Sequence, residues 1–296
     1  MLAVYSGGVT APRQIGAQSF DFDRRVAVMA IVNRTPDSFH DRGATFALDR
    51  AVDAALRAAH DGADWIDVGG VPFGRGPVVT LDEELRRVLP VVEAIAGASD
   101  IVISVDTFNA EVARRSIEAG AAVINDTSGL FDPDMAAVVA DSSATLVLTH
   151  SLQPPRSAPP RPSYGDVVDE VVQFLTARVE AAVAAGIPRE RLVVDPGHDL
   201  NKNTHHSLEL TRRLGEMVET GWPVLVSLSN KDFVGETLDR AQGDRLEGSL
   251  AAMVASIMLG ARIVRMHDVP AAVAAVRMTE AILGFREPVY ARHNLE

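Results

Sequence analysis

Eight short apolar runs recur along this chain of 296 residues, and longer helical patterns separate them. The runs are rich in β-branched residues and do not alternate strictly between apolar and polar positions, which is typical of strands buried on both faces of a parallel sheet. They cover residues 26–32, 65–68, 101–105, 121–124, 145–148, 192–194, 224–228 and 263–266. The predicted helices cover residues 46–61, 81–96, 109–119, 165–185, 204–220 and 244–259. Thr80-x-x-Glu83 is typical of a capping box at the start of the second helix.

Polar residues follow most of the predicted strands, namely Asn33, Asp106, His150, Asp195 and Ser229. Eight strand–helix units with polar groups at the carboxyl ends of the strands predict an α/β fold of the (β/α)8 TIM-barrel type. A doubly wound open sheet is the alternative, although the chain lacks the glycine fingerprint that would favour it. We expect a single domain over residues 1–296, with an N-terminal extension over 1–25 and the barrel over about 26–285.

Composition excludes several classes of protein. The chain has 28 Lys plus Arg against 40 Asp plus Glu, a net charge of −12, and 5 % aromatic residues, which argues against broad nucleic-acid or membrane-surface binding. It has no cysteine, so disulfides, cysteine-ligated metal sites and thiol catalysis are excluded. No apolar stretch is long enough to span a bilayer, and the opening Met1–Tyr5 has no charged leader, so we expect a cytoplasmic protein. The only lysines are Lys202 and Lys231.

Short motifs follow seven of the predicted strands in a fixed order. They are Asn33-Arg34-Thr35-Pro36-Asp37-Ser38-Phe39, Asp67-Val68-Gly69-Gly70, Ser104-Val105-Asp106-Thr107, Asn125-Asp126-Thr127-Ser128-Gly129, Asp195-Pro196-Gly197, Ser229-Asn230-Lys231 and Val264-Arg265-Met266-His267-Asp268-Val269. Each motif is weak alone, but the ordered series resembles the dihydropteroate synthase family. That resemblance implies a pterin-binding transferase of folate biosynthesis, which joins 6-hydroxymethyl-7,8-dihydropterin pyrophosphate to p-aminobenzoate. It also implies Mg²⁺, the release of pyrophosphate and no covalent enzyme intermediate.

The resemblance assigns pterin binding to Asp106, Asn125, Asp195 and Lys231. The edge of a pterin ring alternates hydrogen-bond donors and acceptors, which carboxylates and an amide can pair within a buried slot. A single carboxylate at a strand end could instead be a helix cap. Because three such residues face one barrel mouth, the binding site is the favoured interpretation.

Arg265 and His267 match the family's pyrophosphate-binding pair, and we expect Ser229 to join them. Phosphate sites are common near the last two strands of such barrels. Asn33 matches the position that binds Mg²⁺ in the family, and its amide oxygen suits a hard cation whose other ligands are phosphate and water. Three other histidines have no metal-ligand spacing, so we expect structural or surface roles for His150, His205 and His206.

The departures from the family pattern fall mainly on the loops after strands one, two, six and seven. In loop six the family's Asp-Pro-Gly-x-Gly-Phe-Gly-Lys is replaced by Asp195–Lys202, in which Asp199 and Asn201 stand in place of glycines. We expect their side chains to fill the space that glycine leaves open, or to change the turn. The other departures are Arg34 for an apolar residue, Phe73 for threonine, Arg75 displaced by one position, Asn230 for arginine and Thr149 for methionine.

We interpret the chain as a divergent, second-copy-like member of the family that keeps the pterin and pyrophosphate residues but is weak or inactive in the condensation. Mobile loops must complete such a site, and here those loops are altered. Two alternatives remain open, an active synthase whose loops compensate and a pterin-binding barrel with a different reaction such as methyl transfer. The expected partners are pterin pyrophosphate and, where the second subsite survives, p-aminobenzoate or sulfonamide- and sulfone-like ligands. We expect a homodimer that binds neither nucleic acid nor membranes.

Overall fold

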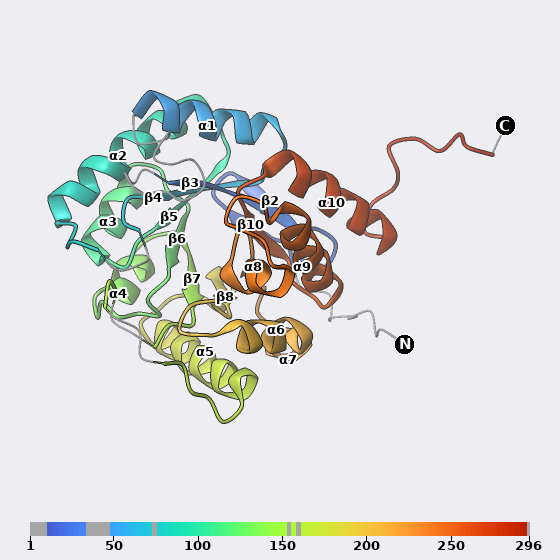
Figure 1. Ribbon diagram of the computed structural model, residues 1–296. Helices are drawn as coiled ribbons and strands as arrows, with labels where there is room; N and C mark the ends of the chain where they lie inside the picture. The colour runs from blue at the N-terminus through green and yellow to red at the C-terminus, as the bar shows by residue number, and fades with distance from the viewer. Residues whose placement is uncertain (1–10, 34–47, 73–75, 153–154, 158–160, 295–296) are drawn as a thin grey trace.

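Eight parallel strands form a ring in the computed structural model, which describes residues 11–33, 48–72, 76–152, 155–157 and 161–294 (Figure 1). The strands are β3 (Ala27–Asn33), β4 (Trp65–Gly69), β5 (Val102–Asp106), β6 (Val123–Asp126), β7 (Thr145–Thr149), β8 (Leu192–Asp195), β9 (Leu225–Ser227) and β10 (Ile263–Met266). Each of the eight predicted runs overlaps one of them. The predicted motif over 34–39 and the departures at Arg34, Phe73 and Arg75 lie outside the described residues.

The ring closes between its two end strands. The strand order is β8-β7-β6-β5-β4-β3-β10-β9, and every neighbouring pair is parallel. A parallel bridge joins Val194 of β8 to Val224, just before β9, and Val194 N donates a hydrogen bond to Pro223 O at 3.1 Å. The predicted (β/α)8 barrel is therefore confirmed, and the alternative of an open doubly wound sheet is wrong.

Helices surround the ring on its outer side (Figure 1). They are α1 (Leu48–His60), α2 (Leu81–Ala98), α3 (Ala110–Glu118), α4 (Met135–Ala140), α5 (Val167–Ala184), the 3-10 helix η1 (Arg189–Arg191), α6 (Thr204–Arg212), α7 (Leu214–Val218), α8 (Asp232–Leu238), α9 (Leu246–Met258) and α10 (Val269–Ile282). The helix predicted over 204–220 is two helices that meet at Arg213. Thr80 caps α2, because its side chain accepts a hydrogen bond from Glu83 N at 3.3 Å, whereas the Glu83 carboxylate pairs with Arg87 at 2.6 Å, so only the Thr80 half of the predicted capping box is present.

A short antiparallel hairpin precedes the barrel and consists of β1 (Arg13–Ile15) and β2 (Gln18–Phe20). Ile15 and Phe20 are buried in a cluster with apolar residues from the starts of the barrel strands, Trp65 among them. The Phe20 and Trp65 rings meet edge to face, with 5.7 Å between their centroids. The hairpin therefore plugs the amino-terminal end of the barrel. Neither of these two strands contains an apolar run, so the sequence predicts only an extension here.

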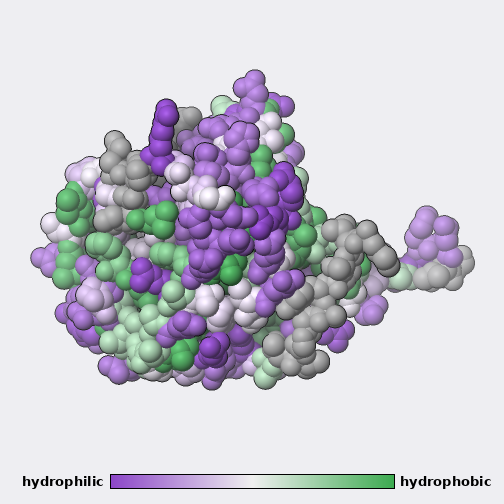
Figure 2. Space-filling view, turned by 90° about the horizontal axis from the view of Figure 1, so that it is seen from below, coloured by the Kyte–Doolittle hydropathy of each residue, from purple (hydrophilic) through white to green (hydrophobic). Residues whose placement is uncertain are grey.

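The main core lies between the ring of strands and the helices. Branched aliphatic side chains dominate it, because the strands are buried on both faces. Polar side chains with scattered apolar ones cover the outer surface, as Figure 2 shows for the face seen from below. Within the described residues, no helix combines the length and the apolar character needed to cross a bilayer.

Candidate functional site

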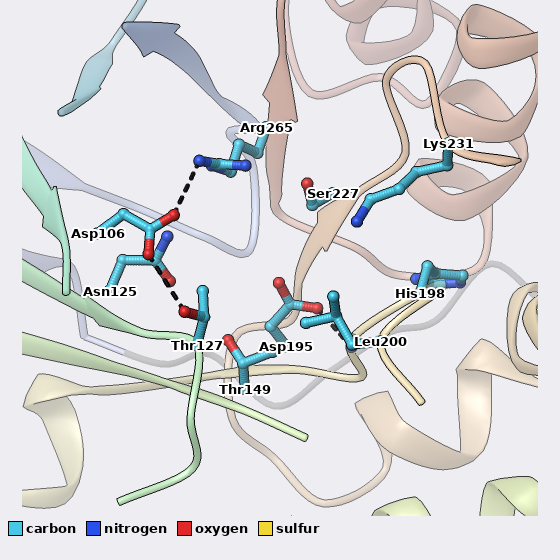
Figure 3. Close-up of a pocket in the computed structure, with 11 residues that line it drawn as sticks. Asp106, Asn125, Thr127, Thr149, Asp195, His198, Leu200, Ser227, Lys231 and Arg265 are labelled. Atoms are coloured by element: carbon cyan, nitrogen blue, oxygen red, sulfur yellow. Dashed lines mark hydrogen bonds and ion pairs between the residues drawn. The ribbon is translucent and has the colours of Figure 1, made fainter. Parts of the chain in front are cut away.

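A cavity lies at the carboxyl ends of the strands, and Figure 3 shows the side chains that line it. The structure brings five of the predicted site residues together there: Asp106, Asn125, Asp195, Lys231 and Arg265. The remaining lining residues are Thr127, Thr149, Gly197, His198, Leu200 and Ser227. The roles of the five residues stay predictions, but their common location follows from the fold.

Strand register explains why these side chains meet. Asp106 of β5 pairs with Asn125 of β6, and Thr149 of β7 pairs with Asp195 of β8. Three of these four are the last residues of their strands, and Asn125 is one residue from the end of β6. In a parallel ring all carboxyl ends lie on one side, so residues distant in sequence meet at one mouth.

Asp67 of β4 organises the polar groups beneath the cavity and is itself fully buried. Its Oδ2 accepts hydrogen bonds from Arg265 Nε at 2.6 Å and from Asn125 Nδ2 at 3.2 Å. Its Oδ1 accepts a hydrogen bond from the Ser104 hydroxyl at 2.6 Å. These bonds satisfy the buried carboxylate and fix the orientations of Arg265 and Asn125.

Asp106 is the second carboxylate that binds Arg265. Arg265 Nη2 donates to Asp106 Oδ2 at 3.1 Å, and the Thr127 hydroxyl donates to Asp106 Oδ1 at 3.2 Å. Burial nevertheless raises the pKa of Asp106 to about 7, because the loss of water outweighs the attraction of Arg265 and the nearby Asp67 adds to the rise. Near neutral pH this carboxyl group can therefore accept or donate a hydrogen bond to a ligand.

Asp195 and Lys231 lie on opposite sides of the junction between β8 and β9. Asp195 Oδ1 accepts a hydrogen bond from Gly197 N at 2.7 Å, and burial raises the pKa of Asp195. Burial lowers the pKa of Lys231, and Asp199 is the charged neighbour that opposes this most strongly. The Lys231 side chain extends from the loop after β9 into the cavity (Figure 3).

Three buried polar atoms on cavity-lining residues have no hydrogen-bond partner within the described part of the chain: Asn125 Oδ1, Thr149 Oγ1 and His198 Nδ1. Thr211 donates its hydroxyl proton to Ser207 O at 2.9 Å, so His198 Nε2, at 3.1 Å from that hydroxyl, must be the donor. His198 Nδ1 is then an acceptor, and burial lowers the pKa of His198 to about 3. Unpaired buried acceptors are costly unless a ligand or water pairs with them.

Ser229 and His267 pair with each other and are not among the cavity-lining residues. Ser229 Oγ accepts a hydrogen bond from His267 N at 3.3 Å and lies 3.0 Å from His267 Nδ1. This pair joins the loops after β9 and β10. Ser229 is two residues from Lys231, and His267 is two residues from Arg265, which are the cavity-lining cations. A common anion site formed by these four residues stays a prediction.

Asn33 ends β3 and pairs in register with Gly69, which places its backbone at the barrel mouth. The position of its side chain lies outside what the structure describes. Among the described residues, no group of three or more His, Asp or Glu side chains is arranged to hold a metal ion. A single amide still suits Mg²⁺, which commonly keeps few protein ligands beside substrate phosphates and water.

The loop after β8 contains the residues that replace the family's glycines. Asp199 and Asn201 have left-handed backbone, with φ of 64° and 54°, a conformation that glycine favours and that Asp and Asn tolerate. A left-handed turn therefore forms without glycine. Asn201 Oδ1 accepts a hydrogen bond from Leu152 N at 2.7 Å, and Asn201 O accepts one from the Tyr164 hydroxyl at 2.9 Å. These bonds tie the loop to the preceding loop, after β7.

Lys202 supports the same loop from the interior. Its ammonium donates to Gly197 O at 3.0 Å and to Leu200 O at 2.9 Å, and it lies 2.8 Å from His150 Nδ1. Burial lowers the pKa of Lys202 to about 7. Burial, with the charge of Lys202 adding to it, lowers the pKa of His150 to about 2. His150 is therefore a neutral acceptor for the ammonium.

The positions of the three histidines match structural or surface roles. His150 supports Lys202, as described above. His206 completes a capping box with Asn203 at the start of α6, and His205 is exposed.

The sequence pattern does not single out four residues that the structure places in or beneath the cavity: Asp67, Thr127, His198 and Ser227. Asp67 and Thr127 belong to motifs at strand ends, and that location was the one available signal. His198 and Ser227 have no pattern of their own.

Comparison with known proteins identifies the family. Residues 29–267 match the family model described as pterin binding enzyme. The chain is 51 % identical over 270 residues to a Mycobacterium leprae protein named inactive dihydropteroate synthase 2, covering 89 % of this chain and 93 % of that protein. It is 41 % identical over 261 residues to Escherichia coli dihydropteroate synthase, covering 88 % and 93 %.

A solved structure agrees with these relatives. Dihydropteroate synthase from Xanthomonas albilineans, in complex with 7,8-dihydropteroate, matches with a TM-score of 0.82 and 40 % sequence identity. The match covers 92 % of this chain and 98 % of that one. The chain therefore belongs to the dihydropteroate synthase family of pterin-binding enzymes.

Proposed function

We propose that this protein binds pterins at the barrel mouth and condenses pterin pyrophosphate with p-aminobenzoate weakly or not at all. The observation that carries the pterin assignment is the side chain of Asn125. Asp67 holds its Nδ2, which leaves Oδ1 as a buried, oriented acceptor in the wall of the cavity. Asn125 Oδ1 and the carboxyl groups of Asp106 and Asp195 can pair with the N–H groups along the edge of a pterin ring.

The named relatives support both parts of the proposal. The Xanthomonas albilineans enzyme, which shares the fold, binds 7,8-dihydropteroate. The relative named inactive, from Mycobacterium leprae, is 51 % identical to this chain, whereas the Escherichia coli synthase is 41 % identical. The altered loops after β8 and β9 supply a physical reason for lost synthesis.

The proposed pyrophosphate side consists of Ser229, Arg265 and His267, with Lys231 between it and the pterin. Arg265 offers a planar fork and Lys231 a point charge, and both are held inside the mouth. Asn33, at the end of β3, is the residue that would hold Mg²⁺. The ion would neutralise negative charge on the pyrophosphate, which is the leaving group of the reaction.

The side chains of the cavity are suited to holding and orienting a ring and to moving a proton. Asp106, with a pKa of about 7, can hold or release a proton at its carboxyl oxygen while Arg265 remains bound to it. Asp195 is fixed by the Gly197 amide. This arrangement positions the pterin for displacement of its pyrophosphate, and the incoming amine would have to be positioned by the altered loops.

Two measurements on the purified protein test the proposal. Calorimetry with 6-hydroxymethyl-7,8-dihydropterin pyrophosphate and Mg²⁺ should show binding. A steady-state assay with added p-aminobenzoate should show turnover at least about a thousandfold below that of the Escherichia coli enzyme, equivalent to about 4 kcal/mol of lost transition-state stabilisation. Absence of pterin binding would overturn the pterin assignment and favour a barrel with a different reaction. Turnover comparable to that of the Escherichia coli enzyme would show an active synthase.

We also propose one domain, with its barrel over about 26–285, that assembles as a homodimer. Met278 and Ile282 of α10 support a dimer, because their side chains are 61 % and 65 % exposed on one helix. Sedimentation velocity tests the assembly, with a concentration-independent monomer as the contrary result. The cytoplasmic location stays a prediction, which microscopy of the tagged protein tests.

A further inference from the structure

The loop after β8 fixes one carboxylate beside the charged residues of the cavity. Asp199 Oδ1 accepts a hydrogen bond from the Ser207 hydroxyl at 2.8 Å, and Asp199 N donates to the same hydroxyl oxygen at 3.1 Å. Asp199 Oδ2 accepts a hydrogen bond from Phe233 N at 3.3 Å, in the first turn of α8. The carboxylate is therefore held by two helices, and it cannot move away without breaking these bonds.

Asp199 lies between two cavity-lining residues, His198 and Leu200, and acts on the cation that extends into the cavity. Its negative charge is the strongest neighbouring influence that favours the ammonium form of Lys231, ahead of Asp195 and Asp106. Lys231 directly precedes α8, and Asp199 is bonded to the first turn of that helix. The loop after β8 and Lys231 are therefore both attached to the start of α8.

The second cavity-lining cation also has internal counter-charges. Arg265 binds Asp67 at 2.6 Å and Asp106 at 3.1 Å. Carboxylates of the chain itself therefore act on both cations, through direct ion pairs at Arg265 and through the nearby charge of Asp199 at Lys231. An incoming pyrophosphate must compete with these fixed carboxylates, whereas an uncharged pterin only has to pair with the polar groups of the wall.

We propose that Asp199 is a specificity-determining residue, which weakens the site for pterin pyrophosphate relative to pterins with an uncharged side chain. This inference rests on the proposed pterin function and narrows its ligand class. The protein would hold the pterin alcohol about as well as its pyrophosphate ester. Such a site binds the pterin ring, but the pyrophosphate group, which a synthase must displace, contributes little to the binding free energy.

Calorimetry with two ligands tests the inference on the full chain. The ligands are 6-hydroxymethyl-7,8-dihydropterin and its pyrophosphate ester, both measured with Mg²⁺ present, and the quantity compared is the ratio of their Kd values. Asp199→Asn removes the charge but keeps an acceptor and a residue that tolerates left-handed backbone. We expect it to raise the preference for the pyrophosphate by on the order of tenfold, the effect of one partly screened charge at close range.

Asn201→Gly is the matched control. Asn201 lies in the same loop with the same left-handed backbone, but it is uncharged and its bonds go to the loop after β7. We expect it to shift both Kd values alike and to leave their ratio unchanged. An equal change of the ratio in both variants would assign the effect to loop mobility and overturn the role of the Asp199 charge.

The remaining outcomes separate this inference from the proposed function. If both ligands bind and Asp199→Asn leaves their ratio unchanged, the inference is wrong and the pterin site stands. If neither ligand binds the parent protein or the Asp199→Asn variant, the pterin function itself is wrong, and the inference is overturned with it.

Discussion

At the scale of single residues, one polar atom of the Asn125 side chain is hydrogen-bonded within the protein, and the other is left to pair with a ligand. Its Nδ2 donates to Asp67, and its Oδ1 is buried without a partner within the described structure. Asn125→Ala removes the acceptor and one hydrogen bond of Asp67. We expect pterin affinity to fall about 5- to 150-fold, or about 1–3 kcal/mol, because donors of the ligand are left unpaired. Calorimetry measures this change.

Asn109→Ala provides the matched control for that substitution. Asn109 caps α3, where its side chain accepts a hydrogen bond from Glu111 N at 3.0 Å, and it does not line the cavity. Loss of this cap should reduce the free energy of unfolding by about 1 kcal/mol without changing the Kd. An equal loss of affinity in both variants would contradict the special role of Asn125.

Lys202 gives the stability of the protein a pH dependence of defined sign. Its pKa is about 7 in the folded protein and near the ordinary value of 10.5 in the unfolded chain. Between these values the unfolded chain binds more protons, so the free energy of unfolding rises with pH, by at most about 1.4 kcal/mol per pH unit. Below pH 7 this contribution is level.

Urea unfolding of the parent protein and of Lys202→Met, at several pH values from about 6 to 9, measures the contribution. The other titrating groups are common to both proteins. Above about pH 7, where the neighbouring His150 and His198 are neutral in both the folded and unfolded chain, the stability of the parent relative to the variant should therefore increase with pH. A difference that is independent of pH across this range would show that the buried amine has an ordinary pKa.

The sequence predicts which of these residues meet, but not how they pair. A place at the end of a strand is enough to bring Asp106, Asn125 and Asp195 to one mouth. The ion pair between Arg265 and Asp67 joins residues 198 positions apart in the chain. This ion pair depends on side-chain rotamers, which the periodicity of the sequence does not predict. The same is true of His198 Nδ1, which is unpaired among the described residues.

At the scale of elements, the loops after β4, β8 and β9 carry the changes that we connect with lost synthesis. Replacing all three with the family's sequences should restore measurable dihydropteroate formation, because the strand-end pterin residues are already in place. Replacing one loop alone should restore less than one third of the activity gained with all three, since loops that close on one substrate act together. A steady-state assay of the single and triple replacements measures this.

Complementation of a synthase-deficient strain gives the cellular counterpart of that assay, with soluble expression checked separately. Growth supported by the parent protein would contradict the loop explanation. A folded triple replacement that binds pterin but yields no product would show that the deficiency lies elsewhere in the chain.

The barrel strands were predictable because a buried apolar run marks each of them. All eight barrel strands and the cap of α2 follow from the sequence. The hairpin of β1 and β2 and the short helices α4 and α8 do not, because the hairpin strands contain no apolar run and six or seven residues carry too little helical periodicity. The break at Arg213 also escapes prediction, since the apolar pattern runs through both α6 and α7.

At the scale of the whole molecule, the two ends of the barrel have separate tasks. Phe20 is fully buried in the amino-terminal plug, at the end opposite the cavity. Phe20→Ala should lower the free energy of unfolding by about 3–5 kcal/mol through the cavity that it leaves. Pterin affinity of the native fraction should be unchanged.

Phe131→Ala is the control, because that side chain is 56 % exposed and its loss should change stability little. Denaturant unfolding and calorimetry on the same samples measure both properties. A large loss of pterin affinity in Phe20→Ala, with the protein still folded, would show that the two ends are coupled.

The ring of strands has a seam. β7 and β8 pair at four positions and β9 and β10 at three, but β8 meets the strand beside it through the single bridge of Val194 with Val224. Asp195 and Lys231 stand on the two sides of this seam. A pterin that binds both residues would therefore link β8 to β9 at the place where neighbouring strands share the fewest paired residues. The bound ligand would then stabilise the closure of the ring. Without the ligand, strands β8 and β9 would be the neighbouring strands that separate most easily, at the same place where the ligand enters.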